Sequence, residues 1–248
     1  MRIIGVIPAR YQSTRFPGKP LVDIAGKSMI QRVYEQAQKA SSLADVVVAT
    51  DHSGIADHVK AFGGNVLLTR EDHQSGTDRC QEVVEQLEEL PEAVINIQGD
   101  EPFIQPEQID LVAACFQDKN VELATLVKVI DNELVLNDPN TPKVVLDSES
   151  NAIYFSRQAI PYLRDVPESD WLKSHIFYKH IGIYGYLTDS LKKITQLKPS
   201  ILERAEALEQ LRWLENGYRV RVKETQFESE GIDTPEQLQE IISRLVKG

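Results

Sequence analysis

Cysteine is scarce in this chain, since Cys80 and Cys115 are the only two among 248 residues. Two cysteines are too few for the disulfide framework of a small secreted protein, and both lie in patterns typical of helix interiors, so we expect reduced core residues. The chain also lacks an apolar run long enough to span a bilayer, and its N-terminus enters an apolar strand pattern without the features of a signal peptide. We therefore expect a cytoplasmic protein.

Positive charge is also in short supply. The 27 Lys and Arg residues are outnumbered by 38 Asp and Glu residues, which gives a formal net charge of -11. An acidic surface repels phosphate backbones and anionic lipids, so we expect neither a nucleic acid nor a membrane as a partner.

Two common glycine motifs for nucleotide binding are missing. No G-x-G-x-x-G follows the first predicted strand, which argues against a dinucleotide cofactor and a dehydrogenase. Gly26-Lys27-Ser28 resembles the end of a P-loop, but the motif requires glycine where this chain has Leu21. We therefore do not expect a phosphate-binding P-loop there.

Four basic residues are nevertheless present in the first twenty positions, which contain no acidic residue. The apolar run at 3–7 predicts a buried strand, and Pro8 ends its pairing because proline has no backbone N–H. The following loop carries Arg10, Arg15 and Lys19. Open α/β sheets bind ligands beyond the carboxyl ends of their strands, so this basic loop predicts a polyphosphate site. Solvated surface cations are the alternative.

Strand and helix patterns alternate as far as residue 118, which is typical of parallel βαβ units. The second half instead contains consecutive strand patterns, at 123–130, 144–147, 152–156 and 177–187. We predict an α/β fold: a single Rossmann-like, doubly wound, mostly parallel sheet with an antiparallel β insertion in the second half. One domain over residues 1–248 is expected, with one half at 1–120 and the other at 121–230.

Two aspartates follow or precede predicted elements in a way that suits metal binding. Asp100 ends a buried strand, and Asp233 comes just before the capping box at 234–237 that starts the last predicted helix. Carboxylates facing a basic loop suit Mg²⁺ with a triphosphate, although each aspartate alone is more often a turn residue. Ser75 and Gly76 precede another helix, where small residues allow a base or ribose to approach, and an ordinary helix cap is the alternative.

The second half contains candidates for an anionic acceptor. Basic residues gather near its strands, at Arg157, Arg164, His175, Lys179 and His180. A helix predicted over 202–215 places Glu206 and Glu209 on one face, where one of them could turn inward toward a polyhydroxyl ligand. Each of these residues is individually more often a solvated charge.

Several motifs, in this order, carry a family resemblance. They are I-P-A-R-Y-Q-S-T-R-F-P-G-K-P-L, A-T-D, D-H-Q-S-G-T-D-R, N-I-Q-G-D-E-P, Y-F-S-R, K-H-I-G-I-Y-G-Y, L-E-Q-L-R and I-D-T-P-E. The chain resembles the 3-deoxy-manno-octulosonate (Kdo) cytidylyltransferases over essentially its whole length. The first motif alone is shared with the sialic-acid cytidylyltransferases, and Y-F-S-R, K-H-x-G-I-Y and L-E-Q-L-R narrow the resemblance to the Kdo enzymes.

This resemblance implies an enzyme that transfers CMP from CTP to the 2-hydroxyl of Kdo and releases pyrophosphate, for lipopolysaccharide or capsule synthesis. It implies catalytic roles for Lys19, Arg10, Asp100 and Asp233, with Mg²⁺ bound by Asp100 and Asp233. It implies nucleotide binding by Arg10, Ser13, Arg15, Lys19, Ser75, Gly76 and Gln98. It implies sugar binding by Arg157, His180, Tyr184, Glu209 and Gln210.

The resemblance also implies a homodimer with CTP and Kdo as its substrates. It implies that the half at 1–120 binds the nucleotide and that the half at 121–230 binds the acceptor sugar and forms the dimer. The same chemistry on 8-amino-Kdo or a sialic acid remains an alternative acceptor assignment. A non-catalytic nucleotide-binding protein is an alternative of a different class, and the presence of both aspartates beside the basic loop argues against it.

Overall fold

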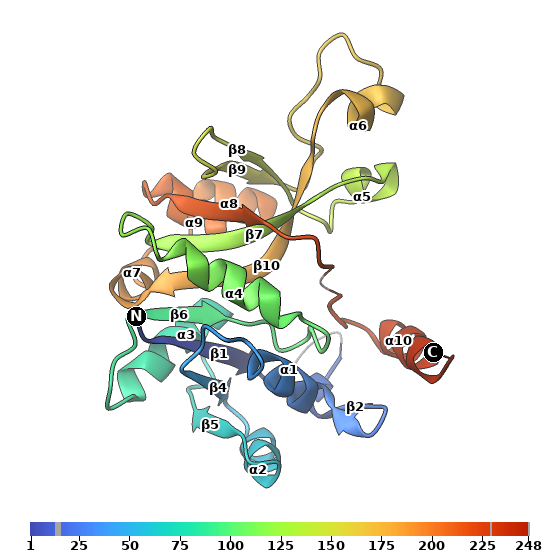
Figure 1. Cartoon of the computed structure of the whole chain (residues 1–248). Coiled ribbons are helices and arrows are strands. Elements are labelled where there is room, and N and C mark those ends of the chain that lie inside the picture. Colours follow the sequence, from blue (N-terminus) through green and yellow to red (C-terminus); the bar gives the residue numbers. More distant parts are fainter. Residues whose placement is uncertain (13–15, 229, 248) are drawn as a thin grey trace. The chain divides into compact units, whose positions relative to one another are not determined.

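The computed structural model describes residues 1–12, 16–228 and 230–247. The chain forms two compact units, Met1–Asp110 with Glu228–Gly248, and Leu111–Phe227 (Figure 1). Helix α4 (Pro106–Cys115) contains the point in the sequence where the first unit passes into the second. The predicted single-domain organisation, with halves at 1–120 and 121–230, stays a prediction.

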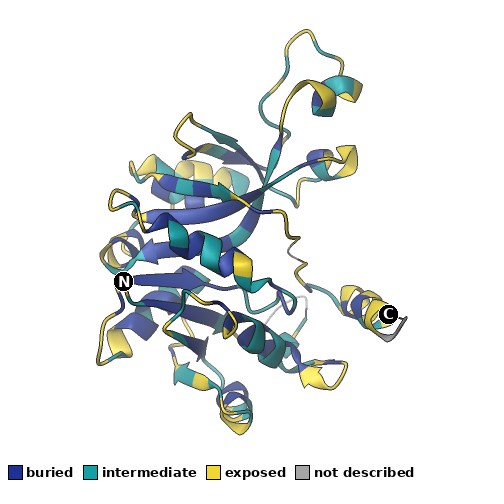
Figure 2. Cartoon of the chain, viewed as in Figure 1, coloured by how far each residue is buried: buried dark blue, intermediate teal, exposed yellow. Residues whose placement is uncertain are grey.

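The first unit is built on a parallel sheet. Its strands are β1 (Ile3–Ala9), β4 (Asp45–Thr50), β5 (Asn65–Leu68) and β6 (Ala93–Asn96), in the order β6-β1-β4-β5. All three pairings are parallel, and β1 is buried along most of its length because it has a strand on each side and helices on both faces of the sheet (Figure 2). The apolar run that follows Arg2 thus forms a central strand, as predicted.

Helices connect these strands on both faces of the sheet. α1 (Met29–Ala37) and α2 (Ser53–Ala61) lead outward from β1 to β4 and β5, and α3 (Gly76–Gln86) returns from β5 to β6. Parallel crossovers are right-handed, so a reversal of direction places α3 on the face opposite α1 and α2. The unit is therefore doubly wound, as the sequence predicts.

The Gly26-Lys27-Ser28 sequence forms part of a small hairpin. β2 (Asp23–Ile24) pairs antiparallel with β3 (Lys27–Ser28), and Ala25 and Gly26 in the turn have positive φ. Lys27 Nζ lies 2.6 Å from a Glu35 oxygen, so this lysine forms a surface ion pair. The interpretation that these residues are not a P-loop is confirmed.

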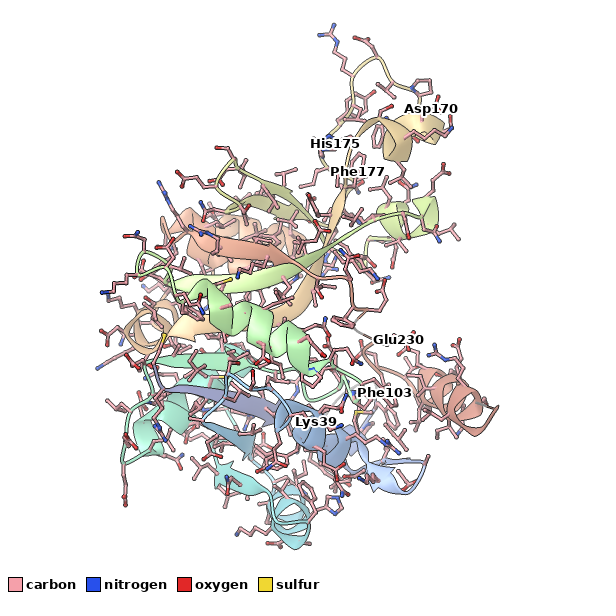
Figure 3. The ribbon with its side chains drawn as sticks, viewed as in Figure 1. Lys39, Phe103, Asp170, His175, Phe177 and Glu230 are labelled. Carbon is pink, nitrogen blue, oxygen red and sulfur yellow. The ribbon has the colours of Figure 1, made fainter. Side chains whose placement is uncertain are left out.

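The last helix, α10 (Pro235–Lys247), completes the first unit from the other end of the chain. Its residues Leu238 and Ile241 pack with Ile24, Met29 and Ile232 in one buried cluster. Phe103, labelled in Figure 3, packs against the same cluster. Burial of these side chains joins the two separate segments of the unit.

The second unit contains the predicted antiparallel strands. β10 (Tyr178–Leu187) pairs antiparallel with β7 (Leu123–Val129) and with β8 (Lys143–Leu146), which forms a hairpin with β9 (Ala152–Ser156). β11 (Val220–Glu224) adds to β7 in parallel. The register of β10 against β7 shifts between Ile181 and Tyr184, so β10 has a bulge at Gly182 and Ile183. That bulge was not predicted.

Short helices surround these strands. They are α5 (Glu133–Asn137), α6 (Trp171–Ser174), α7 (Thr188–Ile194), α8 (Ile201–Glu206) and α9 (Gln210–Glu215), with 3-10 turns at Lys19–Leu21 in the first unit and Glu168–Asp170 in the second. Trp171 is buried, and its ring stacks on that of Phe177 with centroids 5.9 Å apart. Asp170, His175 and Phe177 lie in the same part of the second unit (Figure 3).

The single helix predicted over 202–215 is wrong, because Ala207 takes a left-handed conformation (φ 51°) and separates α8 from α9. Glu206 and Glu209 therefore do not share one helix face. The Arg157 guanidinium donates to the carbonyls of Glu206 and Ala207 at 2.6 and 3.2 Å, which satisfies acceptors that the helix end leaves open. A tertiary contact thus stabilises a break that alanine's own helix propensity opposes.

The predicted α/β class, with a mainly parallel sheet and an antiparallel part in the second half, is confirmed. Both cysteines are free and buried, and burial raises the pKa of the Cys115 thiol. In the described part of the chain, no helix is both long enough and apolar enough to cross a bilayer.

Candidate active site

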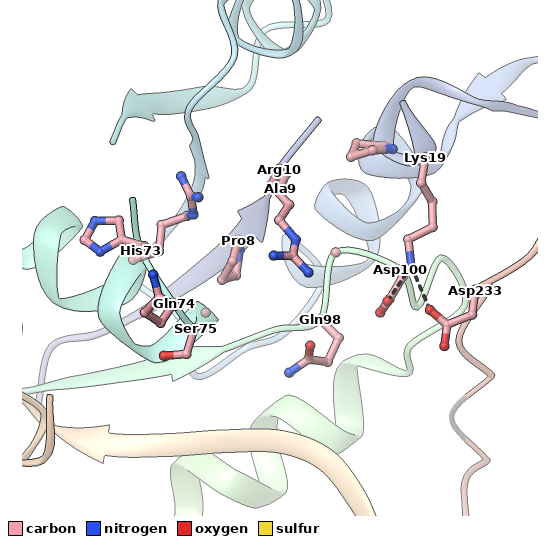
Figure 4. Close-up of a pocket in the computed structure, with 14 residues that line it drawn as sticks. Pro8, Ala9, Arg10, Lys19, His73, Gln74, Ser75, Gln98, Asp100 and Asp233 are labelled. Carbon is pink, nitrogen blue, oxygen red and sulfur yellow. Dashed lines mark hydrogen bonds and ion pairs between the residues drawn. The ribbon is translucent and has the colours of Figure 1, made fainter. Parts of the chain in front are cut away.

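The carboxyl ends of β1 and β6 open onto a pocket in the first unit (Figure 4). The chain leaves β1 toward β4 on one side and returns to β6 on the other, and ligands of open α/β sheets bind where the strand order reverses in this way. The lining comes from four parts of the sequence: Pro8, Ala9, Arg10, Lys19, Pro20, His73, Gln74, Ser75, Gly76, Arg79, Gln98, Gly99, Asp100 and Asp233.

Two glycines give the pocket its backbone shape. A Cβ on Gly99 would lie 2.6 Å from the Pro8 carbonyl oxygen, so only glycine lets the chain leave β6 this close to β1. Gly18 has φ 72°, which glycine adopts readily, and its N–H donates to the Tyr11 carbonyl at 2.9 Å. This bond closes the basic loop and positions Lys19 directly after it.

Lys19 connects two carboxylates that are 133 positions apart in the sequence. Its Nζ lies 2.7 Å from Asp100 Oδ2 and 3.0 Å from Asp233 Oδ1, as Figure 4 shows. The Lys19 side chain is only 14% exposed, whereas Asp100 and Asp233 are 31% and 40% exposed. The two accepting oxygens therefore converge on one cation at the edge of the pocket.

Local structure holds Asp233 in this place. The Ile232 N–H donates to the Asp100 carbonyl at 2.9 Å, which joins the two backbones next to the carboxylates. Thr234 and Gln237 form the predicted capping box of α10, with Gln237 N to Thr234 Oγ1 at 3.3 Å and Thr234 N to Gln237 Oε1 at 3.1 Å. The Gln237 side chain also accepts from the Asp233 N–H at 2.7 Å. The start of the helix thus fixes the backbone that carries the second carboxylate.

Arg79 provides a buried cation beside the pocket. It is only 4% exposed, and its guanidinium lies 2.8 Å from Asp51 Oδ2 and also donates to Thr69 Oγ1. Ser75 caps α3, where its Oγ accepts from the Asp78 N–H at 3.2 Å and the Asp78 carboxylate accepts from the Ser75 N–H. Charge compensation by Asp51 explains how an arginine can be buried here.

The second unit holds Arg157 in a network of backbone carbonyls. Besides the Glu206 and Ala207 carbonyls, its guanidinium donates to the Pro139 carbonyl at 2.9 Å. The Glu206 side chain turns inward, where it accepts from Ser156 Oγ at 2.7 Å and from the Arg157 N–H at 2.9 Å. The contacts with the three backbone carbonyls use three of the five N–H groups of the Arg157 guanidinium and leave two for another acceptor.

His180 and Tyr184 lie in contact on β10. Their ring centroids are 5.1 Å apart, and the edge of Phe155 also packs against His180, at 5.3 Å. Burial lowers the pKa of His180 to about 3 and raises the pKa of Tyr184 well above its ordinary value, so both side chains are neutral near pH 7. Glu209 lies half-buried near Tyr184, and the next residue, Gln210, is buried.

Comparison with known proteins assigns the family. Residues 4–225 match the model of the cytidylyltransferase family. The 3-deoxy-manno-octulosonate cytidylyltransferase of Parabacteroides distasonis is 55% identical, over 99% of this chain and 98% of the relative. The enzyme of the same name from Bacteroides thetaiotaomicron is 54% identical over 96% of each chain. The chain belongs to the 3-deoxy-manno-octulosonate cytidylyltransferase family.

Solved structures agree with this family assignment. A CMP:2-keto-3-deoxy-manno-octonic acid synthetase complexed with CTP superposes with a TM-score of 0.92 and 41% identity, covering 100% of this chain and 99% of the other. A 4-diphosphocytidyl-2C-methyl-D-erythritol synthase from Anaerococcus prevotii superposes with a TM-score of 0.62 at 13% identity, over 99% and 98% of the two chains, which shows a shared fold.

The structure of this cytidylyltransferase gathers many of its predicted site residues in two places. The pocket of the first unit brings together Arg10, Lys19, Ser75, Gly76, Gln98, Asp100 and Asp233. The second unit contains the sugar-binding candidates Arg157, His180, Tyr184, Glu209 and Gln210. Ser13 and Arg15 lie outside the described residues. The individual roles of all these residues stay predictions.

Sequence analysis of the cytidylyltransferase missed several pocket residues. Arg79 and His73 line the pocket, and Asp51 and Glu82 are the carboxylates that they contact. All but Glu82 lie in motifs that carried the family resemblance, A-T-D and D-H-Q-S-G-T-D-R. Arg79 could have been found from its position near the start of a helix. The positive end of the helix dipole disfavours a cation there, so an arginine at this position predicts a carboxylate partner.

Proposed function

We propose that this protein transfers CMP from CTP to the 2-hydroxyl of Kdo and releases pyrophosphate. The names of relatives 54–55% identical over nearly the whole chain support this reaction, as does the CTP complex of the similar solved structure. The structural observation that carries the proposal is the meeting of Lys19 with Asp100 and Asp233 at the switch point of the sheet. A cation and two carboxylates at this place suit a metal-bound triphosphate.

In the proposed reaction, the hydroxyl oxygen of the sugar forms a bond to the α-phosphorus of CTP. The bond from that phosphorus to the pyrophosphate oxygen breaks, and the hydroxyl proton passes to water. Both reactants are anionic, so their approach requires compensating positive charge, which Arg10 and Lys19 supply in the pocket. An in-line displacement depends mainly on alignment of the two oxygens, so we expect no covalent enzyme intermediate.

We further propose that Asp100 and Asp233 bind Mg²⁺. Their oxygens already converge on the single positive charge of Lys19, and two carboxylates leave coordination positions for water and phosphate oxygens, as Mg²⁺ prefers. In the described residues no group of three or more Asp, Glu, His or Cys side chains is placed to hold a metal ion, so phosphate and water oxygens would have to complete the coordination. When bound, Mg²⁺ supplies Lewis-acid stabilisation of charge on the phosphates. Lys19 is then available to donate to the phosphates instead of the carboxylates.

We assign Kdo binding to Arg157, His180, Tyr184, Glu209 and Gln210 of the second unit. Arg157 has two N–H groups beyond those given to backbone carbonyls, which suits the sugar carboxylate. The neutral pair His180 and Tyr184 suits hydroxyl groups because it adds no charge near an anionic substrate.

Pyrophosphate release tests the function. Purified protein with CTP, Mg²⁺ and Kdo should release pyrophosphate, and omission of the sugar should abolish the signal. A binding protein without activity would retain CTP and release nothing. With Kdo, 8-amino-Kdo and a sialic acid in competition, Kdo should be the preferred acceptor. Full turnover by an Asp100→Ala variant would remove the metal assignment.

We also propose a cytoplasmic homodimer whose product enters lipopolysaccharide or capsule synthesis. Exposed apolar side chains in the second unit support self-association, with Ile153 59%, Tyr162 75% and Ile176 58% exposed. A two-fold dimer is the commonest assembly of a soluble chain. Light scattering should give twice the chain mass, and Ile176→Asp should shift the mass toward the monomer if this surface is the interface.

A further inference from the structure

The bulge in β10 is occupied by one hydroxyl group from the neighbouring strand. Thr125 on β7 is fully buried, and its Oγ1 lies 2.7 Å from the Ile183 carbonyl and 3.3 Å from the Ile181 carbonyl. The same oxygen lies 2.9 Å from Nε2 of His180. One threonine therefore contacts the Ile183 carbonyl inside the bulge, the Ile181 carbonyl just before it, and the side chain of His180.

The single hydroxyl hydrogen of Thr125 fixes the direction of these hydrogen bonds. A hydroxyl group has one hydrogen to donate, and a carbonyl oxygen can only accept. The shortest contact, 2.7 Å to the Ile183 carbonyl, takes the Thr125 hydrogen. Toward His180, Oγ1 must therefore accept, so the proton of the neutral imidazole lies on Nε2. Nδ1 then carries a lone pair and no hydrogen.

We propose that Thr125 is a positioning residue that holds His180 as the Nε2-protonated neutral tautomer, so that Nδ1 accepts a hydrogen bond from a hydroxyl group of the bound sugar acid. The tautomer follows from the contacts within the second unit, whereas the identity of the ligand rests on the proposed function. Burial, which lowers the pKa of His180, supports a ring that stays neutral and does not add a proton on Nδ1.

Tyr184 gives a reason why the ligand group is a hydroxyl. Within the described residues its phenolic oxygen is buried without a hydrogen-bond partner, which is costly in the free protein. The raised pKa of Tyr184 keeps that oxygen protonated, so the side chain offers a donor beside His180, which offers an acceptor at Nδ1. A hydroxyl group both donates and accepts, so hydroxyls of a polyol satisfy both side chains. A carboxylate cannot donate to Nδ1.

The test combines nuclear magnetic resonance with kinetics on the full-length protein. With ¹⁵N-labelled histidine, a long-range ¹H–¹⁵N correlation spectrum at pH 7 distinguishes the protonated from the unprotonated ring nitrogen. His180→Gln identifies the His180 signals among the five histidines. Thr125→Val removes the hydroxyl at nearly constant shape, and Thr125→Ser restores it.

We expect wild type and Thr125→Ser to show a proton on Nε2 and none on Nδ1. Thr125→Val should populate the other tautomer and raise KM for Kdo about fivefold to tenfold, as loss of one neutral hydrogen bond predicts, with KM for CTP unchanged. A proton on Nδ1 of His180 in the wild-type protein would overturn the assignment. A Thr125→Val variant that kept both the wild-type tautomer and the wild-type KM for Kdo would also overturn it. The tautomer in the wild-type spectrum is read without any measurement of activity, so it separates failure of this assignment from failure of the proposed function.

Discussion

Gly99→Ala tests the geometry of the pocket most directly. The added Cβ would lie 2.6 Å from the Pro8 carbonyl oxygen, whereas ordinary contacts begin near 3.4 Å. The ends of β1 and β6 must therefore move apart by about 0.8 Å to accommodate one methyl group. The atom in the way belongs to the backbone of the central strand, so no side-chain rotation relieves the contact.

Two effects should follow from this displacement. Forced overpacking of this kind costs about 1–3 kcal/mol, which for a protein of this size lowers Tm by about 2–4 °C per kcal/mol. The displacement also separates Gln98 and Asp100 from Arg10, and a misplacement of about 1 Å costs up to about 10²-fold in rate. We expect Tm to fall by several degrees and kcat/KM for pyrophosphate release to fall at least tenfold.

Gly231→Ala is the matched control. A Cβ at Gly231 meets no atom within 4 Å and its φ is not positive, so the same substitution two residues before Asp233 should leave Tm and activity near wild type. Differential scanning calorimetry and a coupled pyrophosphate assay measure both quantities. If Gly99→Ala matched Gly231→Ala in Tm and kcat/KM, the close approach of β6 to β1 would not be what shapes the pocket.

Lys19→Met should lower the rate of pyrophosphate release about 10²–10³-fold, because it removes a positive charge from the pocket. Lys27→Met breaks only a surface ion pair and should keep wild-type activity. Equal rates for the two variants would contradict the role of Lys19. Ile232→Ala should lower the free energy of unfolding by about 3 kcal/mol, because a fully buried side chain next to Asp233 is lost. Urea unfolding measures this change. An unchanged midpoint would show that the cluster around Ile232 does not hold α10 in place. The pKa of His180 is lowered to about 3 in the folded protein, so the neutral ring contributes its full stability above about pH 6.5. This contribution is lost as the pH falls toward 3, by at most about 1.4 kcal/mol per pH unit. Urea unfolding at pH 7 and pH 5 should show the loss, and His180→Gln should make it smaller.

Local patterns in the sequence were sufficient to predict most strands and helices of the first unit and part of the pocket. Hydrophobic runs identify β1 and β6, and the capping box at Thr234 and Gln237 forms as expected. The rule that ligands bind at the carboxyl ends of strands then places Arg10 and Asp100 in one pocket. Each of these signals acts over a few residues, which is why the sequence alone reveals them.

The features that sequence analysis missed depend on contacts between distant segments. Ala207 breaks a helix because Arg157 satisfies the carbonyls at the break, and the bulge of β10 is stabilised by a hydroxyl from β7. The meeting of Asp100 with Asp233 was implied by the family resemblance and by no local spacing, because it requires α10 to pack against Ile24 and Met29. Buried Arg79 was overlooked for the same reason, since its partner Asp51 lies in another strand–helix connection.

The first unit is assembled from the beginning and the end of the chain. During synthesis, residues 1–110 leave the ribosome long before Asp233 and α10 exist, so a nascent or truncated chain displays the basic loop and Asp100 without the second carboxylate. Removal of α10 by a protease would likewise leave most of the pocket lining in place, but Asp233 would lose the helix start that fixes its backbone. Only a chain that extends through Asp233 contains both carboxylates, so the pocket is completed after the whole second unit has been synthesised.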